Sequence, residues 1–184
     1  TIDLPAFITG NLVAHHGGRG EMGYVKPLIR NAFLDEHGIR YDEDMRLGED
    51  FALYCEILAK GAAFVLTDPA GYIAVRRTGS LSDAHGAREI GALVQADRRL
   101  LADRSIGAEA REALQRHYIE TLKNWHWLRM IDAVKARSPG AFLACFAAPP
   151  SVALSLLGNL WEQMVVRTGR RFMAAPADGG GRDA

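Results

Sequence analysis

Apolar residues recur at helical spacing through the second half of the chain. Side chains three or four positions apart lie on one face of an α-helix. The first stripe consists of Ile90, Leu93, Val94, Leu100 and Leu101, and the second of Leu114, Tyr118, Leu122, Trp125, Leu128 and Ile131. The break at Ser105-Ile106-Gly107 separates them. The pattern predicts two amphipathic helices, the second running to about Arg137, that pack as a hairpin.

Two proline signals follow this pair. Ser138-Pro139 can open a third helix through Cys145, because proline at the first helical position sacrifices no hydrogen bond. Pro149-Pro150 then forces a break before a fourth helix over residues 151–166. From Ala174 onward the chain is rich in Gly and Ala, and we expect disorder there.

The first half of the chain combines extended and helical patterns. An extended stretch around residues 25–29 passes into a short helix from Asn31 to His37, which Gly38 can close in a left-handed conformation. The segment from Glu49 to Lys60 predicts a longer helix with one buried face, and Gly61 provides its stop. This face consists of Phe51, Tyr54, Cys55, Leu58 and Ala59.

Two short apolar runs surround a turn after this helix. Residues 63–66 and 71–75 flank Thr67-Asp68-Pro69, a pattern typical of two strands joined by a turn. We expect a small sheet edge here, and the glycines at residues 17–20 predict an exposed loop. The fold class is therefore α/β and rich in α-helix.

The length and the charge of the chain limit the kinds of protein that it could be. The chain has 184 residues, of which 48% are hydrophobic, enough for one ordinary core. Its 22 basic and 22 acidic side chains balance, so no bulk field attracts nucleic acid. Cys55 and Cys145 lack the neighbours of a zinc or redox motif, so we expect buried thiols. Residues 1–10 lack a secretory signal, and we expect a cytoplasmic location, with the inner face of the cell membrane as an alternative.

The apolar stretch of residues 141–166 raises the question of a membrane span. Two central prolines and three polar residues leave no run of about twenty apolar residues, which crossing a bilayer requires. Because Arg167, Arg170 and Arg171 follow the stretch, peripheral docking on anionic lipid is one alternative. A helical pair that covers its own core is the favoured interpretation.

Residues 26–82 carry a series of short motifs. In order, they are Lys26-Pro27-Leu28-Ile29-Arg30, Phe33-Leu34-Asp35-Glu36-His37-Gly38-Ile39, Tyr41-Asp42-Glu43, Gly48-Glu49-Asp50-Phe51, Asp68-Pro69, Tyr72 and Arg76-Arg77-Thr78-Gly79-Ser80-Leu81-Ser82. The series resembles the family-two glycosyltransferases of the GT-A fold over about a third of the chain. The Gly-Ser-Leu-Ser loop and the trailing helices are similar to bacterial exopolysaccharide transferases such as those of succinoglycan synthesis. The resemblance implies inverting transfer of a sugar from a nucleotide-sugar donor to a saccharide acceptor.

The Glu49-Asp50 pair is the candidate catalytic group. Inverting transfer needs a base that takes the proton of the acceptor hydroxyl as it attacks the anomeric carbon, and an ionised carboxylate suits this role. At a helix start, unpaired N–H groups and the helix dipole favour an anion, so Asp50 is expected to stay charged without a partner lysine. Capping is the alternative role. Glu49 is expected to be a secondary contact to acceptor or backbone.

Three residues further along are candidates for substrate binding. The resemblance places Arg76, Arg77 and Ser80 in a mobile loop over the nucleotide, where the guanidinium groups could meet the donor diphosphate. A solvated strand end is the alternative interpretation. Trp125 invites a sugar-stacking role, but its place on the apolar stripe favours packing in the core or between helices.

The chain departs from the family in one respect. GT-A transferases hold the nucleotide on a preceding Rossmann-like half that ends in an Asp-any-Asp motif, whose carboxylates bind a divalent ion. No such half opens this sequence, and Asp42-Glu43-Asp44 falls downstream of that position, so we assign it no metal. Because Thr1 is not a methionine, we expect that half to lie upstream, with Mg²⁺ or Mn²⁺ on the leaving diphosphate. This portion alone is expected to be inactive or nearly so.

These observations predict three regions. Residues 1–85 form the acceptor-side half of a GT-A-like catalytic domain, residues 86–168 a helical subdomain and residues 169–184 a disordered tail. The expected partners are a nucleotide-sugar donor and a saccharide acceptor, which the resemblance suggests is lipid-linked. The alternative is a non-catalytic helical module that forms homo-oligomers or docks on a membrane complex, because balanced charge and the long helical tail suit it equally well.

Overall fold

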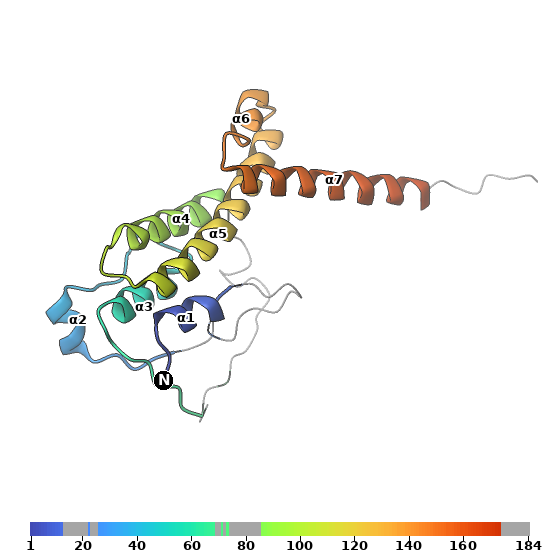
Figure 1. Ribbon diagram of the computed structural model, residues 1–184. Helices are drawn as coiled ribbons and strands as arrows, with labels where there is room; N and C mark the ends of the chain where they lie inside the picture. Colours follow the sequence, from blue (N-terminus) through green and yellow to red (C-terminus); the bar gives the residue numbers. More distant parts are fainter. Residues whose placement is uncertain (13–21, 23–25, 69–70, 72, 74–85, 174–184) are drawn as a thin grey trace, which may run out of the picture.

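The computed structural model describes residues 1–12, 22, 26–68, 71, 73 and 86–173, with side chains as far as Val166. Within these ranges the regular structure is helical. The helices are α1 (Leu4–Gly10), α2 (Asn31–His37), α3 (Glu49–Ala59), α4 (Ala87–Ala102), α5 (Ala108–Lys135), α6 (Pro139–Ala144) and α7 (Pro150–Met173). Figure 1 shows α4 and α5 side by side next to α1 and α3, and α7 extending away from this body.

Helix α5 is the element on which the others assemble. It packs most extensively against α4 and also contacts α1, α6 and α7. The turn between α4 and α5 is stabilised by Asp103, whose carboxylate accepts hydrogen bonds from the N–H and the hydroxyl of Ser105 at 2.8 and 2.7 Å. The hairpin predicted from the two apolar stripes is therefore confirmed.

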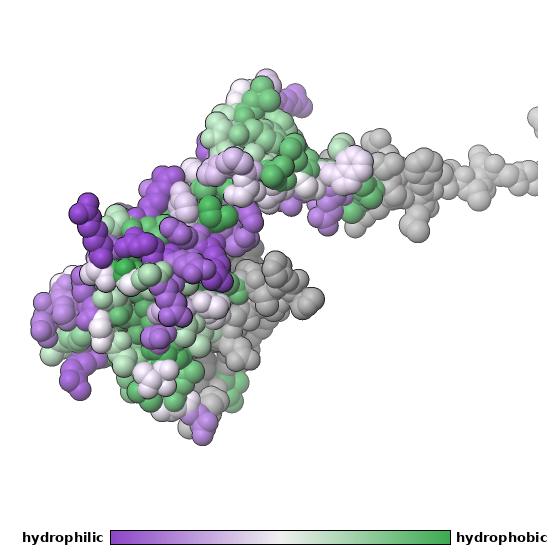
Figure 2. All heavy atoms as spheres, in the orientation of Figure 1, coloured by the Kyte–Doolittle hydropathy of each residue, from purple (hydrophilic) through white to green (hydrophobic). Residues whose placement is uncertain are grey.

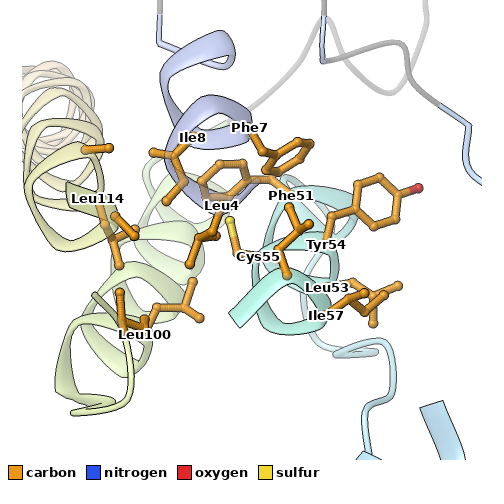
Figure 3. Packing of buried hydrophobic residues seen from close by; sticks show 14 of the residues in the cluster. Leu4, Phe7, Ile8, Phe51, Leu53, Tyr54, Cys55, Ile57, Leu100 and Leu114 are labelled. Atoms are coloured by element: carbon orange, nitrogen blue, oxygen red, sulfur yellow. The ribbon is translucent and has the colours of Figure 1, made fainter. Parts of the chain in front are cut away.

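One large hydrophobic cluster joins the two halves of the chain (Figure 3). Phe7 of α1 lies at its centre with 1% of its surface exposed, and its ring is 5.8 Å from Phe51 and 5.9 Å from Phe64 between centroids. The buried members are Ile2, Leu4, Phe7, Ile8, Ile39, Phe51, Leu53, Tyr54, Cys55, Ile57, Leu58, Leu100, Ile106, Ala110, Ala113 and Leu114. Residues before and after position 86 thus share one core, and the three-region division stays a prediction.

Helix α2 matches the sequence prediction, whereas α3 is buried more extensively than predicted. Helix α2 has the predicted bounds, and Gly38 closes it with a φ of 65°. Helix α3 begins at Glu49 as predicted and buries the predicted face, with Ala59 only partly buried, but its burial extends beyond that face. Seven of its residues are buried: Phe51, Ala52, Leu53, Tyr54, Cys55, Ile57 and Leu58. The physical reason is that α1 and α4 both pack against this helix.

The first of the two expected strands forms one isolated bridge instead of a strand. Ile2 N–H donates to the Phe64 carbonyl at 2.7 Å, and Phe64 N–H donates to the Ile2 carbonyl at 3.3 Å. The apolar run at residues 63–66 therefore pairs with the start of the chain. Of residues 71–75, only Gly71 and Ile73 belong to the described ranges, so a strand there stays a prediction.

The two C-terminal helices begin where the prolines predicted. Pro139 opens α6, and the Ser138 side chain accepts a hydrogen bond from the Ala141 N–H. Helix α7 starts at Pro150 and continues to Met173, beyond the predicted end at Val166. Cys55 and Cys145 are both buried thiols, as expected. No helix in the described part of the chain is both long and apolar enough to cross a membrane. The tail from residue 174 lies outside the described residues.

Helix α5 also buries polar side chains, and the apolar pattern of the sequence did not predict their burial. Leu114 and Leu122 are buried as expected, but so are His117, Thr121 and His126. The Thr121 hydroxyl donates to the His117 carbonyl at 2.9 Å, so its polar group is satisfied within the helix.

Trp125 packs between helices, as the sequence analysis favoured. Its indole nitrogen lies only 2.8 Å from where a Cβ atom on Gly91 of α4 would be, so the missing side chain allows close contact. Arg129 lies over the ring at 4.7 Å.

Asp97 of α4 and His117 of α5 form a buried pair across the hairpin. Asp97 is completely buried, and its two carboxylate oxygens lie 2.9 and 3.1 Å from His117 Nδ1. Burial raises the pKa of Asp97, while the hydrogen bond and the charge interaction with His117 act in the opposite direction. The imidazole ring also stacks on Phe51 of α3, with 4.2 Å between centroids and 20° between planes. The pair thus connects three helices.

Replacing His117 with Phe tests this pair, because the ring stays available to Phe51 while Asp97 loses its partner. We expect His117→Phe to lower the free energy of unfolding at pH 7 by about 3–5 kcal/mol, the usual cost of an uncompensated buried charge. The double variant Asp97→Leu/His117→Phe removes the charge as well and is expected to recover most of the loss. Urea denaturation measures both. A double variant no more stable than His117→Phe would show that the charge pair is not the cause.

Candidate functional site

The first turn of α3 is positioned by a glycine. Gly48 precedes the helix with a φ of 72°, a conformation that side-chain-bearing residues rarely adopt. A Cβ atom here would lie 2.8 Å from the Leu93 side chain of α4. The left-handed backbone therefore favours glycine at this position, and Glu49 and Asp50 follow it directly at the edge of the core.

Asp50 is held by two side chains from the preceding loops. Lys26 Nζ donates to Asp50 Oδ2 at 2.8 Å, and the Tyr41 hydroxyl donates to Oδ1 at 2.8 Å. The expectation that Asp50 would be ionised without a partner lysine was wrong, because Lys26 forms an ion pair with it. The segment that contains Lys26 reaches the helix start from 24 residues upstream, a proximity that spacing along the chain does not indicate.

These contacts keep the carboxylate ionised. Partial burial raises the pKa of Asp50, but the hydrogen bonds from Lys26 and Tyr41 and the lysine charge outweigh it, so the pKa lies below its usual 3.8. Burial, and then the hydrogen bond with Asp50, raise the pKa of Tyr41, so its phenol keeps the proton that it donates. At neutral pH the group is a carboxylate flanked by a cation and a neutral phenol.

Tyr54 completes the surroundings of the carboxylate. It lies one helical turn after Asp50, with its ring in the hydrophobic cluster of Figure 3. Burial and the adjacent Tyr41 and Asp50 raise the pKa of Tyr54, so this phenol also stays protonated. Tyr54 joins the core to the site because its ring packs while its oxygen faces the Asp50–Tyr41 pair.

Asp50 remains accessible in the first turn of its helix. Its side chain is 38% exposed, and the N-cap residue Gly48 has no side chain that could cap α3. A carboxylate offers about four lone-pair positions; Lys26 and Tyr41 occupy two of the four, and the Tyr54 hydroxyl interacts with the same carboxylate. Asp50 also lies in the first turn of α3, where its negative charge interacts favourably with the helix dipole, so the helix-stabilising alternative stays open beside the catalytic prediction.

The remaining predicted site residues are less well defined. Glu49 is the first residue of α3 and is partly buried, so a contact to acceptor or backbone stays a prediction. Arg76, Arg77 and Ser80 lie outside the described residues, and their roles at the nucleotide also stay predictions.

The acidic turn before α3 is engaged within the protein. Asp42 Oδ2 accepts from Arg99 of α4 at 2.9 Å, and its Oδ1 accepts the Asp44 N–H at 3.2 Å. The described ranges contain no group of three or more His, Cys, Asp or Glu side chains that could hold a metal ion. The Asp42 carboxylate therefore fixes this turn against α4.

A Cys, an Asp and a His also come together inside the core, but they do not form a nucleophilic site. Burial raises the pKa of the Cys55 thiol well above its usual value, and the nearby Asp97 charge raises it further. The reactive form of cysteine is the thiolate, which needs an electropositive and partly exposed environment. Cys55, Asp97 and His117 are therefore structural.

Lys26, Tyr41 and Tyr54 are the site residues to which sequence reasoning gave no role. Tyr54 could have been found, because it lies four positions after Asp50 and thus on the same helix face. Lys26 and Tyr41 belong to the motifs that carry the family resemblance, but no spacing rule brings loop residues onto a helix start. Their contribution requires the tertiary structure.

Removing the lysine charge tests the electrostatics of the site. In Lys26→Met, Asp50 loses its ion pair, so its pKa is expected to rise relative to the wild type. Carboxyl ¹³C NMR titration of this chain measures the shift. Arg40→Met is the matched control, because Arg40 pairs with Asp35 and does not contact Asp50. An unchanged Asp50 pKa in Lys26→Met, or an equal rise in Arg40→Met, would contradict the assignment.

Comparisons with known proteins give two curated relatives. No protein-family model and no solved structure matches the chain. It is 34% identical to the succinoglycan biosynthesis protein ExoU of Rhizobium meliloti (strain 1021), over 98% of this chain and 53% of the relative. It is 30% identical to the succinoglycan biosynthesis protein ExoO of the same organism, over 81% of this chain and 42% of the relative. The chain thus spans about half the length of the curated relatives it matches, and it is similar to proteins of succinoglycan biosynthesis.

Proposed function

We propose that this chain is the acceptor-side part of an inverting glycosyltransferase that acts in exopolysaccharide synthesis. Two relatives are named for the biosynthesis of succinoglycan, and the similarity to ExoU extends over almost the whole chain. The motifs from Lys26 to Ser82 supply the reaction class. The substrates would be a nucleotide-sugar donor and a saccharide acceptor, which is lipid-linked by analogy with exopolysaccharide assembly.

The observation that carries the proposal is the state of Asp50. It is ionised, partly exposed and located in the first turn of a packed helix. In the proposed step an acceptor hydroxyl donates to this carboxylate. As the hydroxyl oxygen bonds to the anomeric carbon, the bond from that carbon to the diphosphate breaks and the proton passes to Asp50.

Tyr41 and Lys26 would act on Asp50 and not on the sugar. Tyr41 donates to Oδ1 and Lys26 to Oδ2, so together they fix the plane of the carboxylate. A carboxylate that is already fixed loses less conformational entropy when it orients the acceptor hydroxyl, so the entropic cost of reaching the reactive geometry is smaller. The lysine also lowers the basicity of Asp50. Asp50 is therefore deprotonated at neutral pH, as a base must be, but its driving force for taking the acceptor proton is smaller.

Donor binding is proposed to depend on residues beyond this site. Arg76, Arg77 and Ser80 remain candidates for the donor diphosphate. A divalent ion would neutralise charge on the leaving diphosphate. The described residues do not fit such an ion, since the acidic turn at Asp42 is already engaged by Arg99. No step of the proposed reaction in this part of the chain uses a metal.

Exchange of the carboxylate for its amide tests the base. We expect Asp50→Asn to lower the rate of sugar transfer by roughly 10²–10⁴-fold, the usual contribution of a general base. The assay uses the protein encoded by the complete gene, with nucleotide-sugar consumption as readout. Asp35→Asn is the matched control, because Asp35 is also an exposed, ion-paired carboxylate but lies on α2.

Full transfer activity in Asp50→Asn would remove Asp50 from the base role. Absence of transfer in the wild-type protein with every donor tested would instead favour the alternative of a non-catalytic helical module. The exposed apolar surface of α7 is the observation that keeps this alternative open.

A further inference from the structure

Helix α7 exposes an apolar surface along the side that faces away from its own packing contacts. We call it the outer α7 stripe. Its members are Leu154, Leu157, Trp161, Met164 and Val165, which are 68, 53, 67, 56 and 54% exposed. Their spacings of three and four positions place them on one face of the helix. The expectation that the C-terminal helices would cover their own core is therefore correct for only one side of α7.

The opposite face of α7 holds the helix on the body. Val152 and Leu156 are completely buried, and they pack with Leu122 and with Met130 of α5, respectively. Beyond these contacts α7 extends away from the other helices (Figure 1). In Figure 2, hydrophobic residues also gather over α6, where Leu143 is 67% exposed. The exposed stripe thus lies on a helix that is anchored at one end.

The charge of this part of the chain points to an anionic partner. Residues 122–173 contain seven basic side chains, Lys123, Arg129, Lys135, Arg137, Arg167, Arg170 and Arg171, and two acidic ones, Asp132 and Glu162. The rest of the chain contains 15 basic and 20 acidic side chains. The balanced total therefore conceals a basic C-terminal portion, and the apolar stripe lies within it.

A second copy of the chain is a weaker candidate for the occupant. A stable protein interface involves about 20–30 residues on each side, whereas the stripe offers five. The stripe is also broad, because Met164 and Val165 are adjacent and diverge around the helix, unlike the narrow seam of a coiled coil. A lipid surface needs only a few inserted side chains and nearby positive charge.

We propose that the outer α7 stripe inserts into the surface of an anionic lipid membrane, with α7 lying in the plane of that surface. Leu154, Leu157 and Trp161 would enter the boundary between head groups and acyl chains, a depth of about 5–10 Å for such helices. Trp is well suited to this boundary because its ring is apolar and its N–H is polar. The inference does not rest on the proposed sugar transfer and can hold or fail independently of it.

Sedimentation with lipid vesicles tests the proposal. The chain is expected to sediment with vesicles of equimolar phosphatidylcholine and phosphatidylglycerol, and much less with phosphatidylcholine alone. In Leu157→Ser/Trp161→Ser the partition coefficient should fall by roughly tenfold or more, because two apolar side chains no longer insert. Val65→Ser is the matched control, since Val65 is 72% exposed but lies far from α7 in the sequence and outside the stripe. Circular dichroism of each variant verifies that the helices are retained.

Tryptophan fluorescence locates the contact. The emission of the wild-type chain is expected to shift to the blue on the mixed vesicles, and Trp161→Phe should remove most of the shift while it retains sedimentation. Equal binding to both vesicle types, no binding, or binding unaffected by the double serine variant would overturn the proposal. Concentration-dependent dimers without lipid that the double variant abolishes would assign the stripe to a second copy instead.

Discussion

The stacking of Phe51 on His117 is the contact on which the position of Asp50 depends. The two rings lie 4.2 Å apart and nearly parallel, and the imidazole is fixed from its edge by the buried Asp97 carboxylate. This arrangement connects the start of α3 to both helices of the hairpin. A buried carboxylate is costly unless it is paired, so the pair tolerates little rearrangement. Asp50 immediately precedes Phe51, so the packing of Phe51 also fixes the position of Asp50.

Gly48 completes the constraint from the other side of Asp50. Its left-handed backbone turns the chain into α3 next to the Leu93 side chain of α4. Phe51 is buried whereas Asp50 is partly exposed, so the boundary between core and solvent runs through the first turn of the helix. Rigid support beneath an exposed carboxylate is the arrangement that a positioned base requires.

The sequence predicted those features that depend on local rules. Helix α2 with its terminal Gly38, the start of α3 after Gly48 and the proline-opened helices all follow from preferences within a few residues. It failed where distant segments meet. Phe64 pairs with Ile2, α3 is buried on several sides, and His117 lies inside because Asp97 lies opposite it.

The same distinction between local rules and distant contacts applies to the candidate site. Asp50 could be identified from its place at a helix start within a series of motifs. Lys26 could not be identified as its partner, because the two residues are 24 positions apart and only the tertiary structure brings their side chains into contact. The two proposals also rest on different parts of the chain: Asp50 lies on the packed body, whereas the outer α7 stripe lies on the helix that leaves it (Figure 1).

The pH dependence of sugar transfer tests the central claim about Asp50 most directly. If Asp50 is the base, the acid limb of kcat/KM reports its ionisation. The limb should then move to higher pH in Lys26→Met, together with the Asp50 pKa measured by NMR. The measurement uses the protein encoded by the complete gene. An acid limb that stays in place while the Asp50 pKa rises would contradict the account.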